Sequence, residues 1–198
     1  MIEKRLIEAG ITAIAGVDEA GRGACAGPLV VAAVILADFK ELHEVRDSKE
    51  LSPIKREQLY DLIIANSRAH SIIVISPEEV DKNGLQRSNI EGMRRAIQNL
   101  TQAPEYVLTD GYPIPGLALP NLAVWKGDQV ALTISAASIL AKVARDRIMR
   151  ELDVKYPGYG LADHKGYVTA SHRAALERLG VSPIHRRSYA NIAALINN

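Results

Sequence analysis

The amino-acid sequence predicts an α/β domain with a mixed β-sheet flanked by helices. Three observations predict this class: short apolar runs occur early, segments with helix-capping signals are interleaved with them, and the chain has no internal repeat. Of its 198 residues, 47% are hydrophobic and only 5% aromatic. This composition predicts one domain, residues 1–198, with an aliphatic core.

Five short segments are expected to form the strands. Residues 29–36 are apolar throughout and rich in β-branched side chains, so they should be too apolar to be exposed. The other four segments are 12–17, 71–75, 106–109 and 122–125. No run approaches the ~20 apolar residues that a membrane-spanning helix needs, and the N-terminus has no secretory pattern. We therefore expect a cytoplasmic protein that does not enter a membrane.

Three serines carry the signals of helix N-termini. Each is followed by Pro at the next position, by Glu three residues later, or by both. The first predicted helix begins at Ser52, before Pro53, and ends near Asn66. The second begins at Ser76, with Glu79 in the capping-box position. The third begins at Ser88, with Glu91 three residues later, and ends near Gln102.

The C-terminal part should be helical. A long helix is expected from about Ser135 to Tyr156, with small residues at its start that allow close packing on the sheet. Residues 157–160 should end it. Two shorter helices follow, 171–179, which Gly180 can end, and about 189–196. About residues 157–198 are thus expected to form a helical C-terminal part of the same domain.

Cysteine count and charge restrict the function classes. Cys25 is the single cysteine, which excludes an internal disulfide and a zinc site built on paired cysteines; a small buried side chain is expected there. The net charge of +1 conceals ten Lys/Arg against five Asp/Glu in residues 140–198. This basic third suits a polyanionic partner, although a solvated helical face would have the same composition.

Adjacent carboxylates mark the most informative segment, GVDEAGRG at 16–23. Asp18 and Glu19 end an apolar strand, and a bound cation would remove their mutual repulsion. Because neighbours in a strand point to opposite faces, both can serve one site only if the strand ends or bends at Glu19. The glycines also resemble a dinucleotide-binding loop, but the spacing is wrong and a strand follows where that motif needs a helix.

Two further acids end strands beside glycines, Asp110 and Asp128. Four carboxylates without Cys or His partners favour a hard ion, Mg²⁺ or Mn²⁺. Two such ions would suit phosphodiester hydrolysis. Asp146 is expected to make an ion pair on its helix face.

Seven blocks in this order resemble the motif set of the ribonuclease HII family, over residues 14–188. They are GVDEAGRG (16–23), DSKELS (47–52), TDG (109–111), KGD (126–128), ISAASILAKVARD (134–146), HKGY (164–167) and HRRS (185–188). The resemblance implies a ribonuclease H-like fold and cleavage of the RNA strand of RNA–DNA hybrids, and of DNA at embedded ribonucleotides. Cleavage would lie 5′ to the ribonucleotide, with two Mn²⁺ or Mg²⁺ ions, leaving 5′-phosphate and 3′-hydroxyl ends.

The resemblance also implies roles for individual residues. Asp18, Glu19, Asp110 and Asp128 match the catalytic, metal-binding carboxylates. Gly21, Arg22 and Gly23 match the loop that senses the ribose 2′-hydroxyl, which distinguishes RNA from DNA, and Tyr167 matches the tyrosine that packs on the adjacent sugar. Further candidates for substrate contacts, or for holding the carboxylates, are Lys49, Lys126, Lys142, Lys165 and Arg186.

Small departures from the family pattern concern the loop and its surroundings. Ala24-Cys25 stands where Pro-Leu is usual, and Tyr189 replaces Phe after Ser188. No aromatic pair of the kind that docks on sliding clamps occurs in residues 190–198, and a monomer is expected. Two alternatives stay open: a carboxylate-cluster nuclease without preference for RNA-containing strands, and a non-catalytic duplex-binding protein.

Overall fold

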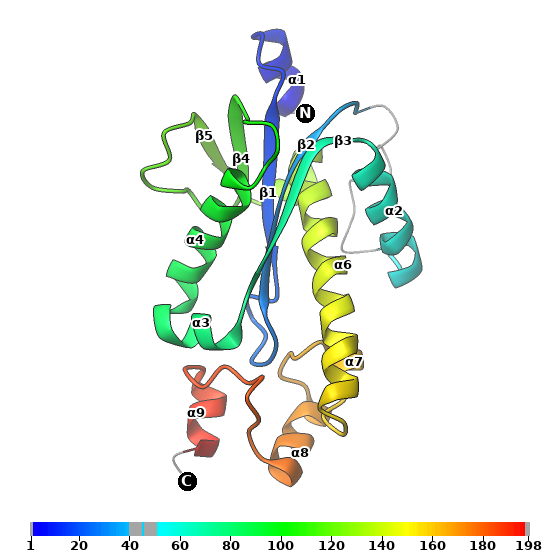
Figure 1. Ribbon diagram of the computed structural model, residues 1–198, viewed down its shortest axis with the longest axis vertical. Helices are drawn as coiled ribbons and strands as arrows, with labels where there is room; N and C mark the ends of the chain where they lie inside the picture. The colour runs from blue at the N-terminus through cyan, green and yellow to red at the C-terminus, as the bar shows by residue number, and fades with distance from the viewer. Residues whose placement is uncertain (1, 40–44, 46–50, 197–198) are drawn as a thin grey trace.

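The computed structural model describes residues 2–39, 45 and 51–196, and it contains a mixed sheet with helices on both faces (Figure 1). The strand order is β3-β2-β1-β4-β5. β1, β2 and β3 are antiparallel neighbours, whereas β4 is parallel to β1 and to β5. The strands are β1 (Ile14–Ala20), β2 (Leu29–Leu36), β3 (Ser67–Ile75), β4 (Tyr106–Asp110) and β5 (Asn121–Val124).

Side chains of β2 alternate between two cores, which is why every residue of this strand is buried. Val30, Ala32 and Val34 pack in one cluster with residues of α2 (Pro53–Ala65) and α6 (Leu132–Lys155). Val31 and Ala33 pack in the other cluster with residues of α4 (Leu85–Gln98). The sheet is therefore the middle of three layers.

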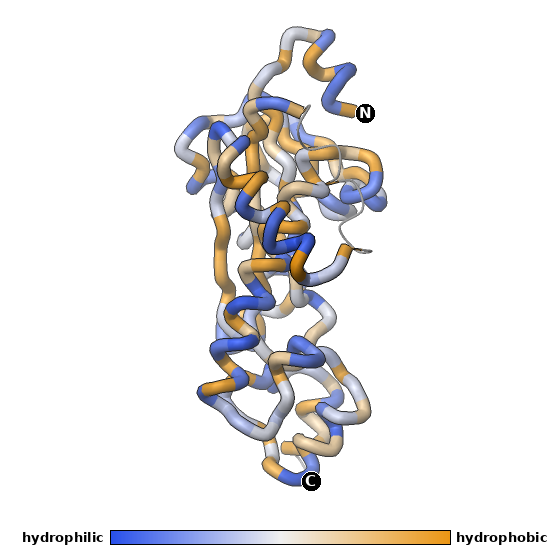
Figure 2. Tube along the Cα trace, turned by 90° about the vertical axis from the view of Figure 1, so that its right-hand side faces the viewer, coloured by the Kyte–Doolittle hydropathy of each residue, from blue (hydrophilic) through white to orange (hydrophobic). Residues whose placement is uncertain are grey.

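The C-terminal helices gather at the end of the molecule farthest from the N-terminus (Figure 1). They are α7 (Leu161–His164), α8 (Ala170–Leu179) and α9 (Ala190–Ile196). The lower part of α6 joins them to the sheet, and the molecule is elongated in a second view as well (Figure 2). Buried Met149, Leu161, Leu176 and Ile192 form the separate apolar cluster of this part.

Several predicted helix ends are confirmed. The hydroxyls of Ser52 and Ser76 accept hydrogen bonds from Lys55 N at 3.3 Å and Glu79 N at 3.1 Å. They open α2 and α3 (Pro77–Asn83). Gly180 ends α8 as expected, with a φ of 76°.

The helix predicted to begin at Ser88 was placed wrongly. α4 begins at Leu85, after Gly84 with a φ of 80°, and ends at Gln98. Ser88 lies inside the helix and is buried, so its spacing from Glu91 does not form a cap.

Three short helices were not expected: α1 (Ile2–Glu8), α5 (Gly127–Val130) and α7. Glu3 of α1 is buried and accepts hydrogen bonds from the backbone N (2.9 Å) and the hydroxyl (3.1 Å) of Thr133. A carboxylate at this position stabilises the unpaired N–H groups of the first turn of α6. This explains why α6 begins at Leu132, before the predicted Ser135.

Candidate active site

Three of the four predicted carboxylates line one cleft. Glu19, Asp110 and Asp128 surround a volume of about 300 Å³ together with Tyr112 and Trp125. Trp125 is 82% exposed, so a large aromatic surface stands open beside the acids.

Parallel pairing of β1 and β4 brings the acids together. Val17 and Thr109 are partners in the register, and an acidic residue follows each of them. A left-handed turn at Lys126, with a φ of 51°, leads into α5 and its Asp128. Gly127 N then donates a hydrogen bond of 2.7 Å to Asp110 Oδ1, which ties the third acid to the segment that carries the fourth.

Asp18 lies beside this cleft and is only 5% exposed. Burial raises the pKa of Asp18 well above its usual value, and the charges of Glu19 and Asp110 raise it further. Each of these causes disfavours the ionised form of Asp18. Within the described residues, no group of three or more His, Cys, Asp or Glu side chains is already placed to hold a metal ion.

The strand does not end at Glu19, which was one of the two conditions for both carboxylates to serve one site. β1 continues to Ala20 and stays paired with β2, Asp18 opposite Ala32 and Glu19 opposite Val31. Asp18 Oδ1 accepts a 2.7 Å hydrogen bond from the backbone N of the next residue, Glu19. Glu19 nevertheless reaches the cleft because it is near the end of the strand.

A second cleft contains the glycine loop. Gly21, Arg22 and Gly23 line a volume of about 330 Å³ together with Tyr167 and with side chains from helices α2 and α6. Glu19 lines both clefts. The predicted ribose-sensing loop, the predicted sugar-packing tyrosine and the carboxylates are therefore neighbours, although Tyr167 is far from them in the sequence.

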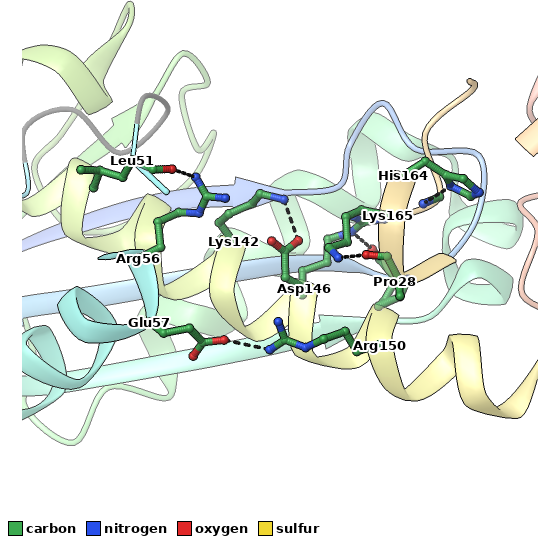
Figure 3. A network of polar contacts seen from close by, with 12 residues as sticks. Pro28, Leu51, Arg56, Glu57, Lys142, Asp146, Arg150, His164 and Lys165 are labelled. Carbon is green, nitrogen blue, oxygen red and sulfur yellow. Dashed lines mark hydrogen bonds and ion pairs between the residues drawn. The ribbon is translucent and has the colours of Figure 1, made fainter. Parts of the chain in front are cut away.

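Three helix residues of the second cleft supply polar groups to it: Arg56, Ser138 and Lys142. Lys142 forms an ion pair of 2.6 Å with Asp146 (Figure 3), which confirms the pair expected for that acid. Burial lowers the pKa of Lys142, and Asp146 opposes this shift. Arg56, which lines the same cleft, donates to the Leu51 carbonyl at 2.5 Å (Figure 3).

Two other predicted contact residues are used inside the protein. The Lys165 ammonium donates to the Ala162 carbonyl. Arg186 is completely buried, and its guanidinium donates to the carbonyls of Gly27 and Arg22, both at 3.1 Å. Lys49 and the rest of the 46–50 segment lie outside the described residues.

Arg22 itself reaches toward the carboxylate cleft. Its guanidinium donates a 2.7 Å hydrogen bond to Gln86 Oε1 and lies 4.2 Å from the centre of the Tyr112 ring. Tyr112 and Trp125 were not predicted as site residues. Trp125 directly precedes the KGD block and Tyr112 directly follows TDG, so proximity to these motifs was the available signal.

Three histidine rings form a cluster next to Tyr167. Nε2 of His172 and Nε2 of His185 are 3.2 Å apart, and the rings of His164 and His172 stack with centroids 4.2 Å apart. Nδ1 of His172 lies 3.0 Å from the Tyr167 carbonyl. Burial lowers the pKa of His172 and lowers that of His185 to about 4, so both rings are neutral near pH 7. Cys25, beside them, is buried as expected.

Comparison with known proteins agrees with this arrangement. The family model described as "Ribonuclease HII" matches residues 15–192. A protein of Salinispora arenicola named "Ribonuclease HII" is 53% identical over 98% of this chain and 73% of its own length. The chain belongs to the ribonuclease HII family. It is therefore a metal-dependent nuclease that hydrolyses phosphodiester bonds of RNA in RNA–DNA hybrids.

Solved structures agree with this fold. The ribonuclease H2 of Pyrococcus horikoshii has a TM-score of 0.81 and 27% identity, covering 93% of this chain and 97% of its own. The Archaeoglobus fulgidus ribonuclease HII, solved in a complex with PCNA, has a TM-score of 0.73 and 30% identity, covering 89% and 95%. The expected ribonuclease H-like fold is thus confirmed. Within the described residues, no helix has the length and apolar character needed to cross a bilayer.

Proposed function

We propose that this enzyme cleaves both the RNA strand of hybrids and DNA strands at single embedded ribonucleotides. The cut lies 5′ to the ribonucleotide and leaves 5′-phosphate and 3′-hydroxyl ends. The observation that carries the proposal is the position of Glu19, which lines both the carboxylate cleft and the cleft of the glycine loop. A phosphodiester at the carboxylates would therefore have its neighbouring sugar at the loop.

The carboxylates fit a pair of hard divalent ions, Mg²⁺ or Mn²⁺, in charge and in ligand chemistry. Asp18, Glu19, Asp110 and Asp128 offer only oxygen ligands. The pKa of Asp18 is raised by burial and then by the charges of Glu19 and Asp110, and bound cations would favour its ionised form. Such ions activate a water molecule and stabilise the leaving oxygen.

The protein's own groups around these acids position the substrate. Backbone N–H groups of residues 21–23 can donate to a ribose 2′-hydroxyl, and the half-exposed Tyr167 ring can pack on the next sugar. Arg56 and Lys142 bring positive charge to the same cleft, which suits the phosphates on either side of the cut. The basic residues 140–198 extend that charge along the C-terminal part.

One assay separates this proposal from its alternatives. The enzyme is incubated with Mg²⁺ or Mn²⁺ and three duplexes: all DNA, RNA–DNA hybrid, and DNA with one embedded ribonucleotide. Cleavage of the second and third only, abolished by chelator and by Asp110→Asn, is expected. Equal cleavage of all three would indicate a carboxylate-cluster nuclease without ribose preference. Binding without cleavage of any duplex would indicate a non-catalytic duplex-binding protein.

A further inference from the structure

The outer side of the glycine loop faces the cleft, and its inner side is fastened by the segment 184–189. Arg186 N donates to the Cys25 carbonyl at 2.8 Å, and Gly27 N donates to the Ile184 carbonyl at 2.9 Å. The buried Arg186 guanidinium adds its two 3.1 Å hydrogen bonds to Gly27 and Arg22. Backbone and side chain together therefore hold the loop along its length.

The Arg22 carbonyl accepts hydrogen bonds from two side chains. Tyr189 Oη donates to it at 2.6 Å, in addition to Arg186 Nη1. Arg186 Nη1 also donates to Tyr189 Oη at 2.7 Å. One carbonyl oxygen thus accepts two donors, which are themselves hydrogen-bonded, and one of these donors is charged and completely buried. A charge-assisted bond away from water is stronger than a neutral one at the surface.

We propose that Arg186 and Tyr189 are positioning residues for ribose recognition: they hold the Arg22 carbonyl inward and thereby point the Gly23 N–H into the cleft. The inference rests on the proposed function of this loop. It follows from the peptide group that Arg22 and Gly23 share. The chain has no cis peptide bond among its described residues. In a planar trans group, the C=O and the N–H point in opposite directions. Fixing the carbonyl toward Arg186 and Tyr189 therefore fixes the N–H on the opposite side.

Gly23 is placed so that its N–H can donate to a ribose bound in the cleft. It lines the cleft with Tyr167 and Glu19, and the nearest atom to a Cβ built on it would be Tyr167 Cε1 at 3.7 Å. The space in front of this residue is therefore open on the side where substrate binds. The charge of Arg186, which the sequence suggested for substrate contact, acts on substrate only through the loop.

Tyr189 allows a conservative test, because Tyr189→Phe removes one hydroxyl and keeps the ring. The matched control is Tyr159→Phe, because Tyr159 Oη donates to the Gly180 carbonyl at 2.9 Å, which is also in the C-terminal part but is not a carbonyl of the loop. Three quantities are measured for both variants and the wild type. They are kcat/KM on duplex DNA with one embedded ribonucleotide, Kd for the matched all-DNA duplex, and amide hydrogen exchange of residues 21–27.

Tyr189→Phe should lower kcat/KM about 3- to 10-fold, the effect of one net hydrogen bond. It should leave Kd for all-DNA duplex unchanged and accelerate amide exchange in the loop, whereas Tyr159→Phe should change none of the three. Wild-type kcat/KM and wild-type exchange in Tyr189→Phe would overturn the inference, as would equal losses in the two variants. If the wild type itself shows no preference for the ribonucleotide, the proposed function fails, and the exchange rates alone then decide whether the hydroxyl fixes the loop.

Discussion

Replacement of Gly23 by Ala tests the ribose-sensing cleft with little effect on the fold. Gly23 does not have a positive φ, and the added Cβ would meet only Tyr167 Cε1, at an ordinary contact distance of 3.7 Å. Removing a glycine from the unfolded chain stabilises a compatible site by about 0.4–1 kcal/mol. The free energy of unfolding should therefore stay constant or rise slightly. The methyl group, however, occupies space in front of the loop where the sugar would lie.

Activity should fall steeply in the same variant. A displacement of reacting groups by about 1 Å costs on the order of 10²-fold in rate, or about 3 kcal/mol of barrier. We expect that loss in kcat/KM at an embedded ribonucleotide. Gly21→Ala is the contrasting variant, since its Cβ would lie 1.8 Å from Arg145 Nε at a φ of +87°. The left-handed backbone alone costs about 1–2 kcal/mol, so Gly21→Ala should lose stability and activity together.

The measurements are the midpoint of urea unfolding and steady-state cleavage for wild type and both variants. The reasoning is refuted if Gly23→Ala loses stability in proportion to its activity, because the glycine would then be needed only for the fold. It is also refuted if Gly23→Ala cleaves the embedded ribonucleotide at the wild-type rate, because the cleft would then not contain the sugar.

Three further predictions concern the metals, the junction and pH. Asp110→Asn keeps an oxygen that can accept from Gly127 N but removes a negative charge. Turnover should fall at least ~10³-fold, about 4 kcal/mol of barrier, while duplex affinity is kept. Cleavage by the wild type in excess chelator would contradict a metal role. Tyr167→Ala should lower the cleavage rate about 5- to 150-fold, since aromatic packing is worth ~1–3 kcal/mol, and the loss should fall mainly on duplexes with a single ribonucleotide. Tyr167→Phe should keep most of the packing. If the ratio of single-ribonucleotide to hybrid cleavage is unchanged in the Ala variant, Tyr167 does not read the junction. The pKa of His185, lowered to about 4 by burial, lies below the unfolded value of about 6.5, so the unfolded state binds more protons between these values. The contribution of neutral His185 to the free energy of unfolding should be fully present above about pH 6.5 and should be lost as the pH falls toward 4, a change of about 3 kcal/mol. Unfolding midpoints measured across this range should depend less on pH in His185→Asn than in the wild type. An identical pH dependence in the two proteins would contradict the assignment.

Local sequence signals predicted the sheet well because they act within single elements. The apolar run 29–36 was too apolar for an exposed strand, and β2 has those bounds and is buried throughout. Ser52 and Ser76 were recognisable because a cap needs only its own next turn. The sequence placed acids at the ends of these strands, and the parallel pairing of β1 and β4, which it did not predict, brings them together.

Features that depend on distant partners were not predictable in this way. Ser88 has the spacing of a cap, but the turn that opens α4 forms at Gly84. The carboxylate of Glu3 contributes to the first turn of α6, 130 residues away. Arg186 was a candidate for substrate contact or for holding the carboxylates, but it is completely buried. Its burial is explained by the carbonyls of the loop, which need donors where water is absent.

One face of α6 determines how much change in chain length this enzyme tolerates. Ser138, Lys142, Arg145 and Met149 recur every three or four residues, so they form a single stripe. The first two line the cleft of the glycine loop, Arg145 donates to the carbonyls of Ala26 and Pro28, and Met149 lies in the C-terminal cluster. Because each residue turns the helix by about 100°, inserting or deleting one residue after Ser138 would rotate the remaining stripe away from the loop. The helical register of α6 thus fixes how its contacts with the cleft align with its contacts in the C-terminal cluster. Insertions and deletions should therefore be confined to the turns outside this helix.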